Sequence, residues 1–432
     1  MPRPAWVRMV AGMSIVLAML VTTAVSVYAL PPATNDNFAN AKVISSSSLP
    51  YVEDLDATGS TAEGGETAGS CTDPIAQSVW WRITPTFSGY LRADNSYSVG
   101  PTDLTIYRGT TLGNLVEVGC SYQASDDESN GRTAFRVVAG QRYYIRTSTN
   151  GGLGYMVLHL RKVKPPKNDN FASATQVTSL PFNQTTSTLN ATFEPNEPET
   201  FDIGRGGCEL GRSTIWYTIR PTSTTVIRAD VVTGFDTEIS VYRGTSLGNL
   251  NPLLCNDDIS GVGSGYQSNV AFTALAGKRY YIRVSGYLGE NGDVTVRIRK
   301  GTPPANDRFA NAETLLANGA LHHVTSTAGA TAEPNEPQPS MGACSTLNSW
   351  ATVWYAFNAP TTDAFAIDAS TSGYYTLLAV YTGPSLSNLT EVACADSTYL
   401  EFPTTSGTQY WIQVGGRDGD SGEVQLHLNA VP

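Results

Sequence analysis

The sequence predicts an all-β protein made of three tandem antiparallel β-sandwich, jelly-roll-like domains, each with one disulfide. The first observation is that all six cysteines fall into three pairs of nearly equal separation: Cys71 and Cys120, Cys208 and Cys255, Cys344 and Cys394. The second is an Asn-Asp motif that begins at Asn35, Asn168 and Asn306. A repeat this long is a complete domain rather than a solenoid unit. Equal spacing favours pairing within each domain, while pairing between domains stays open.

The first 29 residues are interpreted as a signal peptide. Arg3 and Arg8 give a basic start, residues 9–27 are almost entirely apolar, and Ala29 ends a small-residue cleavage site. An uncleaved anchor is the alternative, because about 20 apolar residues can span a bilayer. A proline pair follows at once and no cluster of positive charge does, which favours cleavage. No later stretch has spanning length, so we expect a secreted or cell-surface protein without a stable membrane span after cleavage.

The acidic composition argues against two classes of partner, nucleic acids and anionic membrane surfaces. The formal net charge is −11 and the sequence pI is about 4.9. Such a chain lacks the basic stripe that nucleic acids and anionic membrane surfaces require. Only 15% of the residues are charged, and Gly, Ser, Thr and Tyr are plentiful. This composition is typical of a β protein rather than of a helical bundle.

Proline pairs mark the start of each repeat and favour short, stiff linkers. They divide the chain into β-sandwich repeats at 33–162, 168–300 and 306–430. Apolar residues alternate with period two in each repeat, which indicates six to eight short strands. In the middle repeat we expect strands at 214–220, 226–231, 238–242, 269–274, 279–284 and 294–299. The asparagine of each Asn-Asp motif is expected to cap a one-turn helix. Trp80, Trp216 and Trp354 share one strand position and are predicted core anchors.

The order of the repeated motifs resembles a known family. Asn-Asp-Asn-Phe-Ala-Asn-Ala is followed by Glu-Pro-Asn-Glu-Pro, Ile-Trp-Tyr, Phe-Asp-Thr, Val-Tyr-Arg-Gly, Cys-Asn-Asp-Asp and Ala-Gly-Lys-Arg-Tyr-Tyr-Ile-Arg-Val. This series is similar to the bacterial pre-peptidase C-terminal (PPC)-like β-sandwich domains, in three tandem copies over residues 33–430. The resemblance implies a secreted, non-catalytic jelly-roll module of the kind appended to exported enzymes or surface proteins.

The sequence does not contain a complete set of catalytic residues that we can recognise. Residues 244–248 match the Gly-x-Ser-x-Gly nucleophile motif, which requires a following helix, but Pro252 comes soon after and the equivalent loops repeat the same turn. The four histidines have no partners at the spacing of a triad or a zinc site. The cysteines are all expected in disulfides, which excludes a thiol nucleophile. We therefore predict that the protein is not an enzyme.

The acidic residues of the middle repeat are the candidate metal ligands. Hard oxygen ligands on loops held by a disulfide are what Ca²⁺ selects, and they predict a calcium site. Its candidate residues are Glu194, Glu197, Asp236, Asp257 and Asp258. The alternative is that these carboxylates are solvated or cap turns. Pro101 and Tyr375 stand where Asp236 lies in the other repeats, so any such site should be best formed in the middle one.

Tyrosines in the expected turns and loop mouths could contact a sugar or a peptide. They are Tyr97, Tyr122, Tyr266, Tyr287, Tyr374 and Tyr399.

The function that we predict is binding or adhesion outside the cell, to an extracellular polymer or a surface protein, because linked weak sites gain avidity. The first alternative is an array that binds extracellular carbohydrate. The second is a hydrolase that uses a carboxylate pair such as Glu194 with Asp257. An array would be retained on a polymer without releasing product, whereas a hydrolase would lose turnover in Glu194→Gln.

Overall fold

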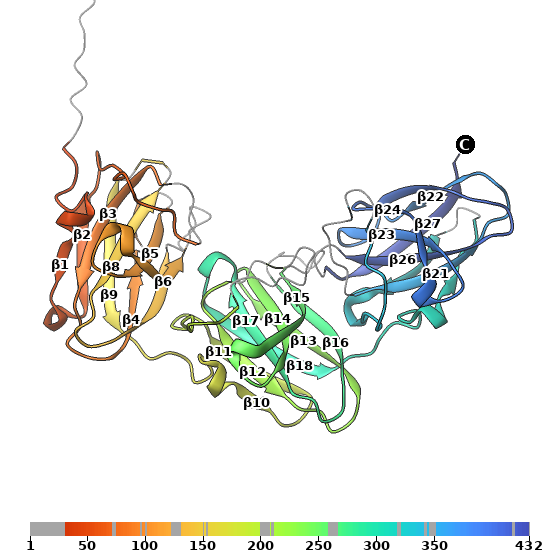
Figure 1. Ribbon diagram of the computed structural model, residues 1–432, viewed down its shortest axis with the longest axis horizontal. Helices are drawn as coiled ribbons and strands as arrows, with labels where there is room; N and C mark the ends of the chain where they lie inside the picture. The colour runs from red at the N-terminus through yellow and green to blue at the C-terminus, as the bar shows by residue number, and fades with distance from the viewer. Residues whose placement is uncertain are drawn as a thin grey trace, which may run out of the picture.

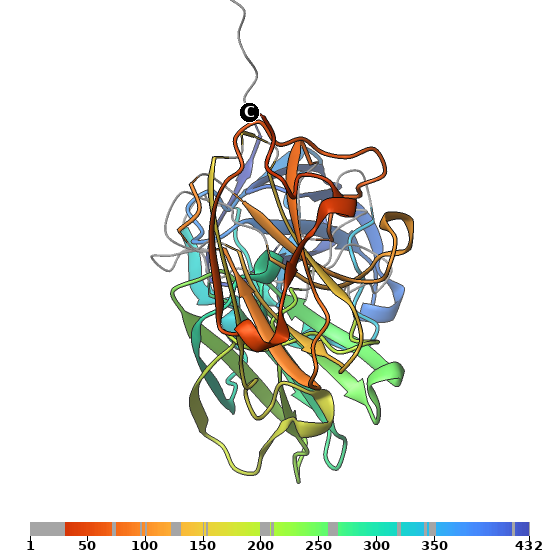
Figure 2. The same ribbon diagram turned by 90° about the vertical axis from the view of Figure 1, so that its left-hand side faces the viewer.

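The computed structural model describes residues 31–70, 75–95, 97–99, 102–121, 131–149, 151–152, 154–198, 208, 211–257, 267–317, 321–340, 344, 351–416 and 420–431. The predicted signal peptide, residues 1–29, lies outside these segments. The described chain forms three β-sandwiches that follow one another along the long axis of the molecule (Figure 1). The view from one end shows them overlapping (Figure 2). We call them modules 1, 2 and 3.

Each module contains nine strands within the described residues. Module 1 has β1 (Lys42–Ile44), β2 (Tyr51–Asp56), β3 (Gln77–Ile83), β4 (Gly89–Asp94), β5 (Asp103–Arg108), β6 (Val116–Ser121), β7 (Arg132–Val137), β8 (Tyr143–Thr149) and β9 (Tyr155–Lys162). Module 2 has β10 (Thr175–Val177), β11 (Phe182–Ser187), β12 (Ile215–Ile219), β13 (Thr225–Thr233), β14 (Thr237–Gly244), β15 (Leu250–Asn256), β16 (Asn269–Ala274), β17 (Tyr280–Gly286) and β18 (Asp293–Lys300). Module 3 has β19 (Glu313–Thr314), β20 (Leu321–Ser326), β21 (Val353–Asn358), β22 (Ala364–Asp368), β23 (Thr376–Thr382), β24 (Thr390–Ala395), β25 (Tyr399–Pro403), β26 (Gln409–Gly416) and β27 (Glu423–Ala430).

The helices of the described segments are all single 3₁₀ turns. They are η1 (Phe38–Asn40), η2 (Ser46–Ser48), η3 (Leu112–Asn114), η4 (Phe171–Ser173), η5 (Leu247–Asn249), η6 (Tyr287–Gly289), η7 (Phe309–Asn311), η8 (Thr327–Gly329) and η10 (Leu386–Asn388). None of them is long and apolar enough to cross a membrane. The predicted one-turn helix after each Asn-Asp motif is therefore present as η1, η4 and η7.

The predicted all-β sandwich fold is confirmed, and the three modules share one topology. A five-stranded sheet, β10-β12-β17-β14-β15 in module 2, faces a four-stranded sheet, β11-β18-β13-β16. Modules 1 and 3 have the same orders. One pairing departs from the antiparallel prediction, because β10 runs parallel to β12, as β1 does to β3 and β19 to β21. These edge strands have two or three residues, too few to show a period in the sequence.

The core of each module lies between its two sheets. Ile215, Tyr217 and Ile282 of the five-stranded sheet pack with Ile227 and Val296 of the other sheet in module 2. The predicted tryptophan anchors are confirmed as fully buried, but on the outer face of the five-stranded sheet, where Trp216 contacts Phe171 of η4 with ring centroids 5.3 Å apart. The Asn-Asp motif therefore covers the second face of this sheet.

Two of the predicted disulfides lie among the described residues. Cys208 is bonded to Cys255 of β15, and Cys344 to Cys394 of β24. Each bond ties the loop before the tryptophan strand to the far edge strand of the five-stranded sheet. Cys71 lies outside the described residues, so the pairing of Cys71 with Cys120 stays a prediction.

The modules meet through polar contacts that repeat from one joint to the next. Arg92 of β4 pairs with Asp94 and donates from Nη1 to Asn190 Oδ1 of module 2, at 3.2 Å. Arg228, at the same position of β13, pairs with Asp230 and donates to the carbonyl of Ala328 in module 3. Ser421 of module 3 also donates to Asn269 Oδ1 of module 2, at 3.3 Å. These bonds position each module against the next.

Candidate functional site

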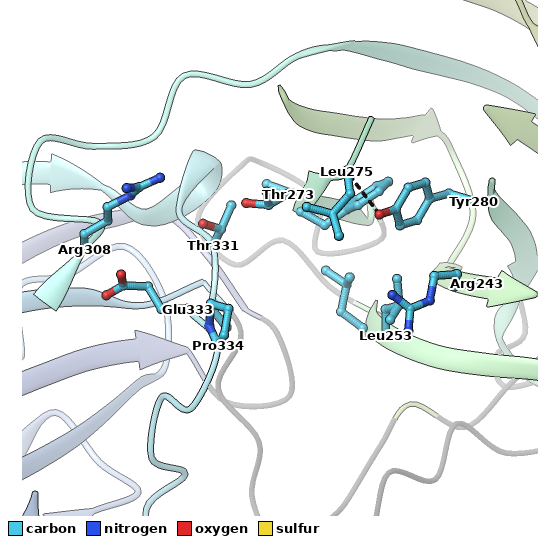
Figure 3. Close-up of a pocket in the computed structure, with 13 residues that line it drawn as sticks. Arg243, Leu253, Thr273, Leu275, Tyr280, Arg308, Thr331, Glu333 and Pro334 are labelled. Atoms are coloured by element: carbon cyan, nitrogen blue, oxygen red, sulfur yellow. Dashed lines mark hydrogen bonds between the residues drawn. The ribbon is translucent and has the colours of Figure 1, made fainter. Parts of the chain in front are cut away.

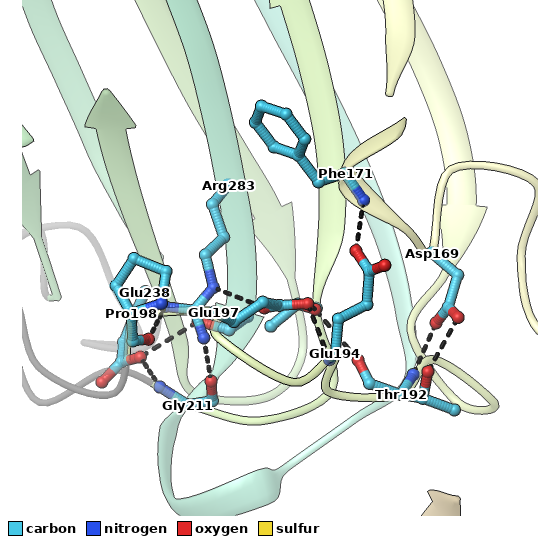
Figure 4. A network of polar contacts seen from close by, with 11 residues as sticks. Asp169, Phe171, Thr192, Glu194, Glu197, Pro198, Gly211, Glu238 and Arg283 are labelled. Carbon is cyan, nitrogen blue, oxygen red and sulfur yellow. Dashed lines mark hydrogen bonds and ion pairs between the residues drawn. The ribbon is translucent and has the colours of Figure 1, made fainter. Parts of the chain in front are cut away.

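The Asn-Asp motif of module 2 is bound to the tryptophan strand. Asn168 Nδ2 donates to the carbonyl of Trp216 at 3.1 Å, and the Trp216 N–H donates back to the Asn168 carbonyl at 2.8 Å. Asp169 accepts the N–H and the hydroxyl of Thr192 at 2.5 and 2.8 Å (Figure 4). The prediction that the asparagine caps the helix is wrong, because its side chain is used by the strand and Asn170 stands at the N-cap without a side-chain bond.

Glu194 and Glu197, two of the candidate calcium ligands, also bind the backbone. Glu194 Oε2 accepts the N–H of Phe171 at 2.6 Å. Glu197 Oε1 accepts the Glu194 N–H and the Thr214 hydroxyl, each at 3.0 Å. The turn between the two glutamates places Asn196 at φ 71°, a left-handed conformation that asparagine tolerates. We call Asn168, Asp169, Glu194, Glu197 and their bonds the clasp; Figure 4 shows Asp169, Glu194 and Glu197.

The clasp recurs in the other modules. Asp36 binds Thr61 and Glu63 binds the Phe38 N–H in module 1; Asp307 binds Thr331 and Glu333 binds the Phe309 N–H in module 3. The sequence motifs that repeat most clearly therefore satisfy buried backbone groups, as a folded core requires. They explain the architecture, and a ligand site has to be sought elsewhere.

A buried arginine lies between two glutamates beside the clasp of module 2. Arg283 of β17 is fully buried, and its Nε lies 3.4 Å from Glu197 Oε2. Its other nitrogens donate to the carbonyls of Pro198 and Gly211. Glu238 of β14, also buried, accepts the Gly211 N–H and the Ser285 hydroxyl. Buried charges need such partners to be tolerated.

Burial raises the pKa of several of these carboxyl groups. Desolvation raises the pKa of Glu197 to about 7, although the Arg283 charge opposes the shift. Desolvation also raises the pKa of Glu238 to about 7, against the Gly211 N–H and the Arg283 charge. Burial raises the pKa of Asp307 to about 6 and that of Glu336 to about 7 in module 3. Between pH 5 and pH 8 these carboxyl groups therefore bind more protons in the folded protein than in the unfolded chain.

We therefore expect the melting temperature to be several degrees higher at pH 5 than at pH 8. A carboxyl group whose pKa is raised on folding contributes stability below its unfolded pKa, and this is lost as the pH rises through the folded value. Calorimetry at constant ionic strength measures the effect. Glu336→Gln, which leaves no buried cation unpaired, should flatten the pH dependence of the module 3 transition. A melting temperature that rises from pH 5 to pH 8 would contradict the prediction.

The remaining candidate calcium ligands are not gathered with the clasp. Asp236 precedes β14, where its N–H donates to Glu290 Oε2 at 2.9 Å, and Asp257 follows β15. Asp258 lies outside the described residues. Within the segments that the structure describes, no three His, Cys, Asp or Glu side chains form a group that could hold a metal ion. The calcium site therefore stays a prediction, to be tested by melting the protein with EDTA and with millimolar Ca²⁺.

The Gly-x-Ser-x-Gly segment forms a turn, as predicted. β14 ends at Gly244, and the single 3₁₀ turn η5 leads directly into β15, so the α-helix that the nucleophile motif requires does not follow the serine.

The predicted surface tyrosines divide into different environments. Tyr97 and Tyr399 are exposed, as predicted. The prediction for Tyr374 is wrong, because this residue is only 5% exposed and its hydroxyl accepts a hydrogen bond from the Thr327 hydroxyl at 3.2 Å. Tyr122 and Tyr266 lie outside the described residues.

A groove between modules 2 and 3 is the best candidate for a binding site. It encloses a volume of about 560 Å³, in the range of ligand pockets. Figure 3 shows side chains of the two modules facing each other across it. The module 2 wall includes Leu253, Thr273 and Leu275, and the module 3 wall includes Thr331 and Pro334. The groove is lined from β15, β16 and the loop that carries the module 3 clasp.

The groove combines apolar and cationic groups. Leu275 is 43% exposed, while the aromatic rings that line the groove, Phe272 and Tyr280, are buried. Arg243 of module 2 and Arg308 of module 3 are exposed on opposite walls (Figure 3). An aliphatic surface flanked by polar groups can bind a sugar or a peptide without a covalent step.

The sequence alone did not predict Arg283, Glu238 or the groove. Glu238 gave no signal, because it alternates with the core residues Ile239 and Val241 and shares the outer face of β14 with Tyr242, where the period-two pattern predicts an exposed polar residue. The groove gave no signal either, because its walls come from two modules that are far apart in the sequence.

Comparison with known proteins gives one family match. Residues 305–428, less than a third of the chain, match the T9SS-associated "Galactose binding domain-like" family. This segment is module 3, and it includes one wall of the groove. The match agrees with a β-sandwich family, while the assignment of all three modules as PPC-like copies stays a prediction. No curated protein matches the chain.

Solved structures of similar fold are distant. The pre-peptidase C-terminal domain of a collagenase from Bacillus anthracis is 15% identical, with 32% of this chain and 100% of that chain covered, at a TM-score of 0.20. The CBM32-1 and CBM32-2 domains of Clostridium perfringens ZmpB are 9% identical, with 57% and 92% covered and a TM-score of 0.15. The CBM22-1-CBM22-2 tandem of Paenibacillus barcinonensis Xyn10C is 10% identical, with 53% and 85% covered and a TM-score of 0.16. TM-scores this low carry no argument about function.

Proposed function

We propose that the protein is a secreted, non-catalytic binding protein that attaches to extracellular polysaccharide. The observation that carries this proposal is the groove between modules 2 and 3, whose second wall belongs to the segment that matches the galactose-binding-domain-like family. Disulfides in modules 2 and 3 suit an oxidising compartment, which supports export. A surface protein as partner is the alternative.

The composition of the groove supports binding rather than catalysis. Among the described residues that line it, the one acidic side chain is Glu333, which accepts the Phe309 N–H at 2.7 Å as part of the clasp. Glycoside hydrolysis uses a pair of carboxyl groups that flank the scissile bond. The pair Glu194 and Asp257, our earlier alternative for a hydrolase, does not line this groove. We therefore expect retention on a polymer and no product.

The test is retention of the mature chain on a panel of insoluble polysaccharides, with an assay for released reducing ends. We expect retention on at least one polysaccharide and no release of reducing ends. Retention on none of them, or turnover of a bound one, would refute the proposal.

Leu275→Thr should weaken binding by about 5-fold, because it removes roughly 1 kcal/mol of apolar contact from the groove. Threonine occupies the equivalent position in module 3, where the Thr405 N–H donates to Tyr410 just as the Leu275 N–H donates to Tyr280. The matched control is Val138→Thr at the same position of module 1, which should leave binding unchanged. Equal losses in both variants would exclude the groove as the site.

A further inference from the structure

We propose that the ligand is an acidic polysaccharide, and that its anionic groups bind a basic cradle at the end of module 2. The inference rests on the proposed function and specifies the chemical class of its ligand. The cradle consists of Arg220, Arg243, Lys278 and Arg279, which line a pocket of about 530 Å³ together with Gly244, Thr245 and Gly277. All four basic side chains are exposed, although the chain as a whole has a net charge of −11.

The geometry of the cradle is set by two turns. Arg243 lies near the end of β14, while Lys278 and Arg279 lie in the turn before β17. Arg220, directly after β12, donates from Nε to the carbonyl of Gly277 at 2.8 Å, which holds its guanidinium at the turn. None of the four cations belongs to an ion pair within the described residues. Their charge is therefore available to an anionic ligand.

The repeats themselves show that these charges are not required for folding. Arg243 pairs with Tyr280 across strands β14 and β17, and Arg108 pairs with Tyr143 across β5 and β8, so Arg108 is the module 1 equivalent of Arg243. The equivalent positions hold Thr84, Arg108, Gln141 and Arg142 in module 1, and Asn358, Thr382, Thr408 and Gln409 in module 3. Module 3 builds the same strands and turns with four neutral side chains. The fold therefore does not require basic residues at these four positions of module 2.

The cradle continues into the groove, since Arg243 lines both. A saccharide chain that places a carboxylate or sulfate in the cradle would lay a sugar ring against Leu253 and Leu275. Single-stranded nucleic acid is disfavoured, because base binding uses exposed aromatic faces and the rings that line the groove, Phe272 and Tyr280, are 5% and 2% exposed. The combination of aliphatic and cationic groups favours an acidic sugar polymer.

The experiment measures binding of the full mature chain to sodium polygalacturonate and to its fully methyl-esterified form, which has the same backbone without the charges. We expect the wild type to bind the acidic form at least about 10-fold more tightly, with an affinity that falls as salt rises. The variant Arg220→Asn, Arg243→Thr, Lys278→Thr, Arg279→Gln takes its side chains from module 3 and should lose this preference. Circular dichroism and melting check that it folds.

A matched pair of double variants tests the location. Arg243→Thr with Arg279→Gln should weaken binding of polygalacturonate several-fold, whereas Arg108→Thr with Arg142→Gln, the same changes in module 1, should have little effect. Equal binding of both forms of the polymer, with no effect of the fourfold variant, would overturn the cradle and leave the proposed function standing. Failure to bind any polysaccharide would overturn both. Tighter binding of an oligonucleotide, lost in the fourfold variant, would overturn the assignment to a polysaccharide.

Discussion

Replacing Arg283 with glutamine is expected to destabilise module 2 by about 3 kcal/mol at pH 8, because it leaves two buried glutamates without their cation. For a domain of this size the melting temperature should fall by roughly 10 °C. The loss should be smaller below pH 6, where burial, which raises the pKa of Glu197 and of Glu238 to about 7, allows both to be protonated. Calorimetry of the full chain at the two pH values measures it.

The equivalent residues of module 3 suggest how the stability lost in Arg283→Gln could be restored. Module 3 has Gln413 in place of Arg283 and the apolar Leu377 in place of Glu238, and Gln413 Nε2 donates to Glu336 Oε1 at 2.8 Å. Leu377 is buried beside the Cys344–Cys394 bond. Arg283→Gln combined with Glu238→Leu should therefore recover most of the lost stability. A double variant no more stable than Arg283→Gln alone would contradict this account of the pair.

Removing the disulfide of module 2 should cost about 4 kcal/mol in the chain-entropy model, for the loop of 47 residues that it closes. The double variant Cys208→Ala, Cys255→Ala avoids a free thiol, and its transition should fall by more than 10 °C in the same calorimetric experiment. Peptide mapping without reducing agent should also recover Cys71 linked to Cys120. A peptide linking two modules, or an unchanged transition in the variant, would contradict the scheme.

Much of the fold could be predicted because its signals are local. Period-two alternation located strands such as Arg279–Val284, observed as β17, and the repeated tryptophan marked a buried position. The edge strand Thr175–Val177 was missed, since three residues cannot show a period. Tyr374 was misplaced because it packs in the core of module 3, beside residues that lie far from it in the sequence, and its hydroxyl is bonded to Thr327.

The candidate site was harder to predict, because an acidic residue on a loop has the same appearance in sequence whether it binds a metal, solvent or backbone. Glu194 and Glu197 accept backbone N–H groups. Arg283 lies in the repeated motif at residues 276–284 but was not predicted as a site residue, and it lies against Glu197. The groove depends on how two modules meet, and that depends on single side chains such as Arg228.

The joint between modules also bears on which module could be duplicated with its connection kept. Modules 1 and 2 each reach their successor with an arginine, Arg92 or Arg228, whereas the same position of β22 is Ala366. Module 3 therefore lacks the arginine with which modules 1 and 2 contact the next module, so a tandem duplication of module 2 would keep this contact and a duplication of module 3 would not. The joint also uses contacts from elsewhere in each module, such as Asn291 to Arg132 and Ser421 to Asn269, so an added copy of module 3 would keep only part of the joint.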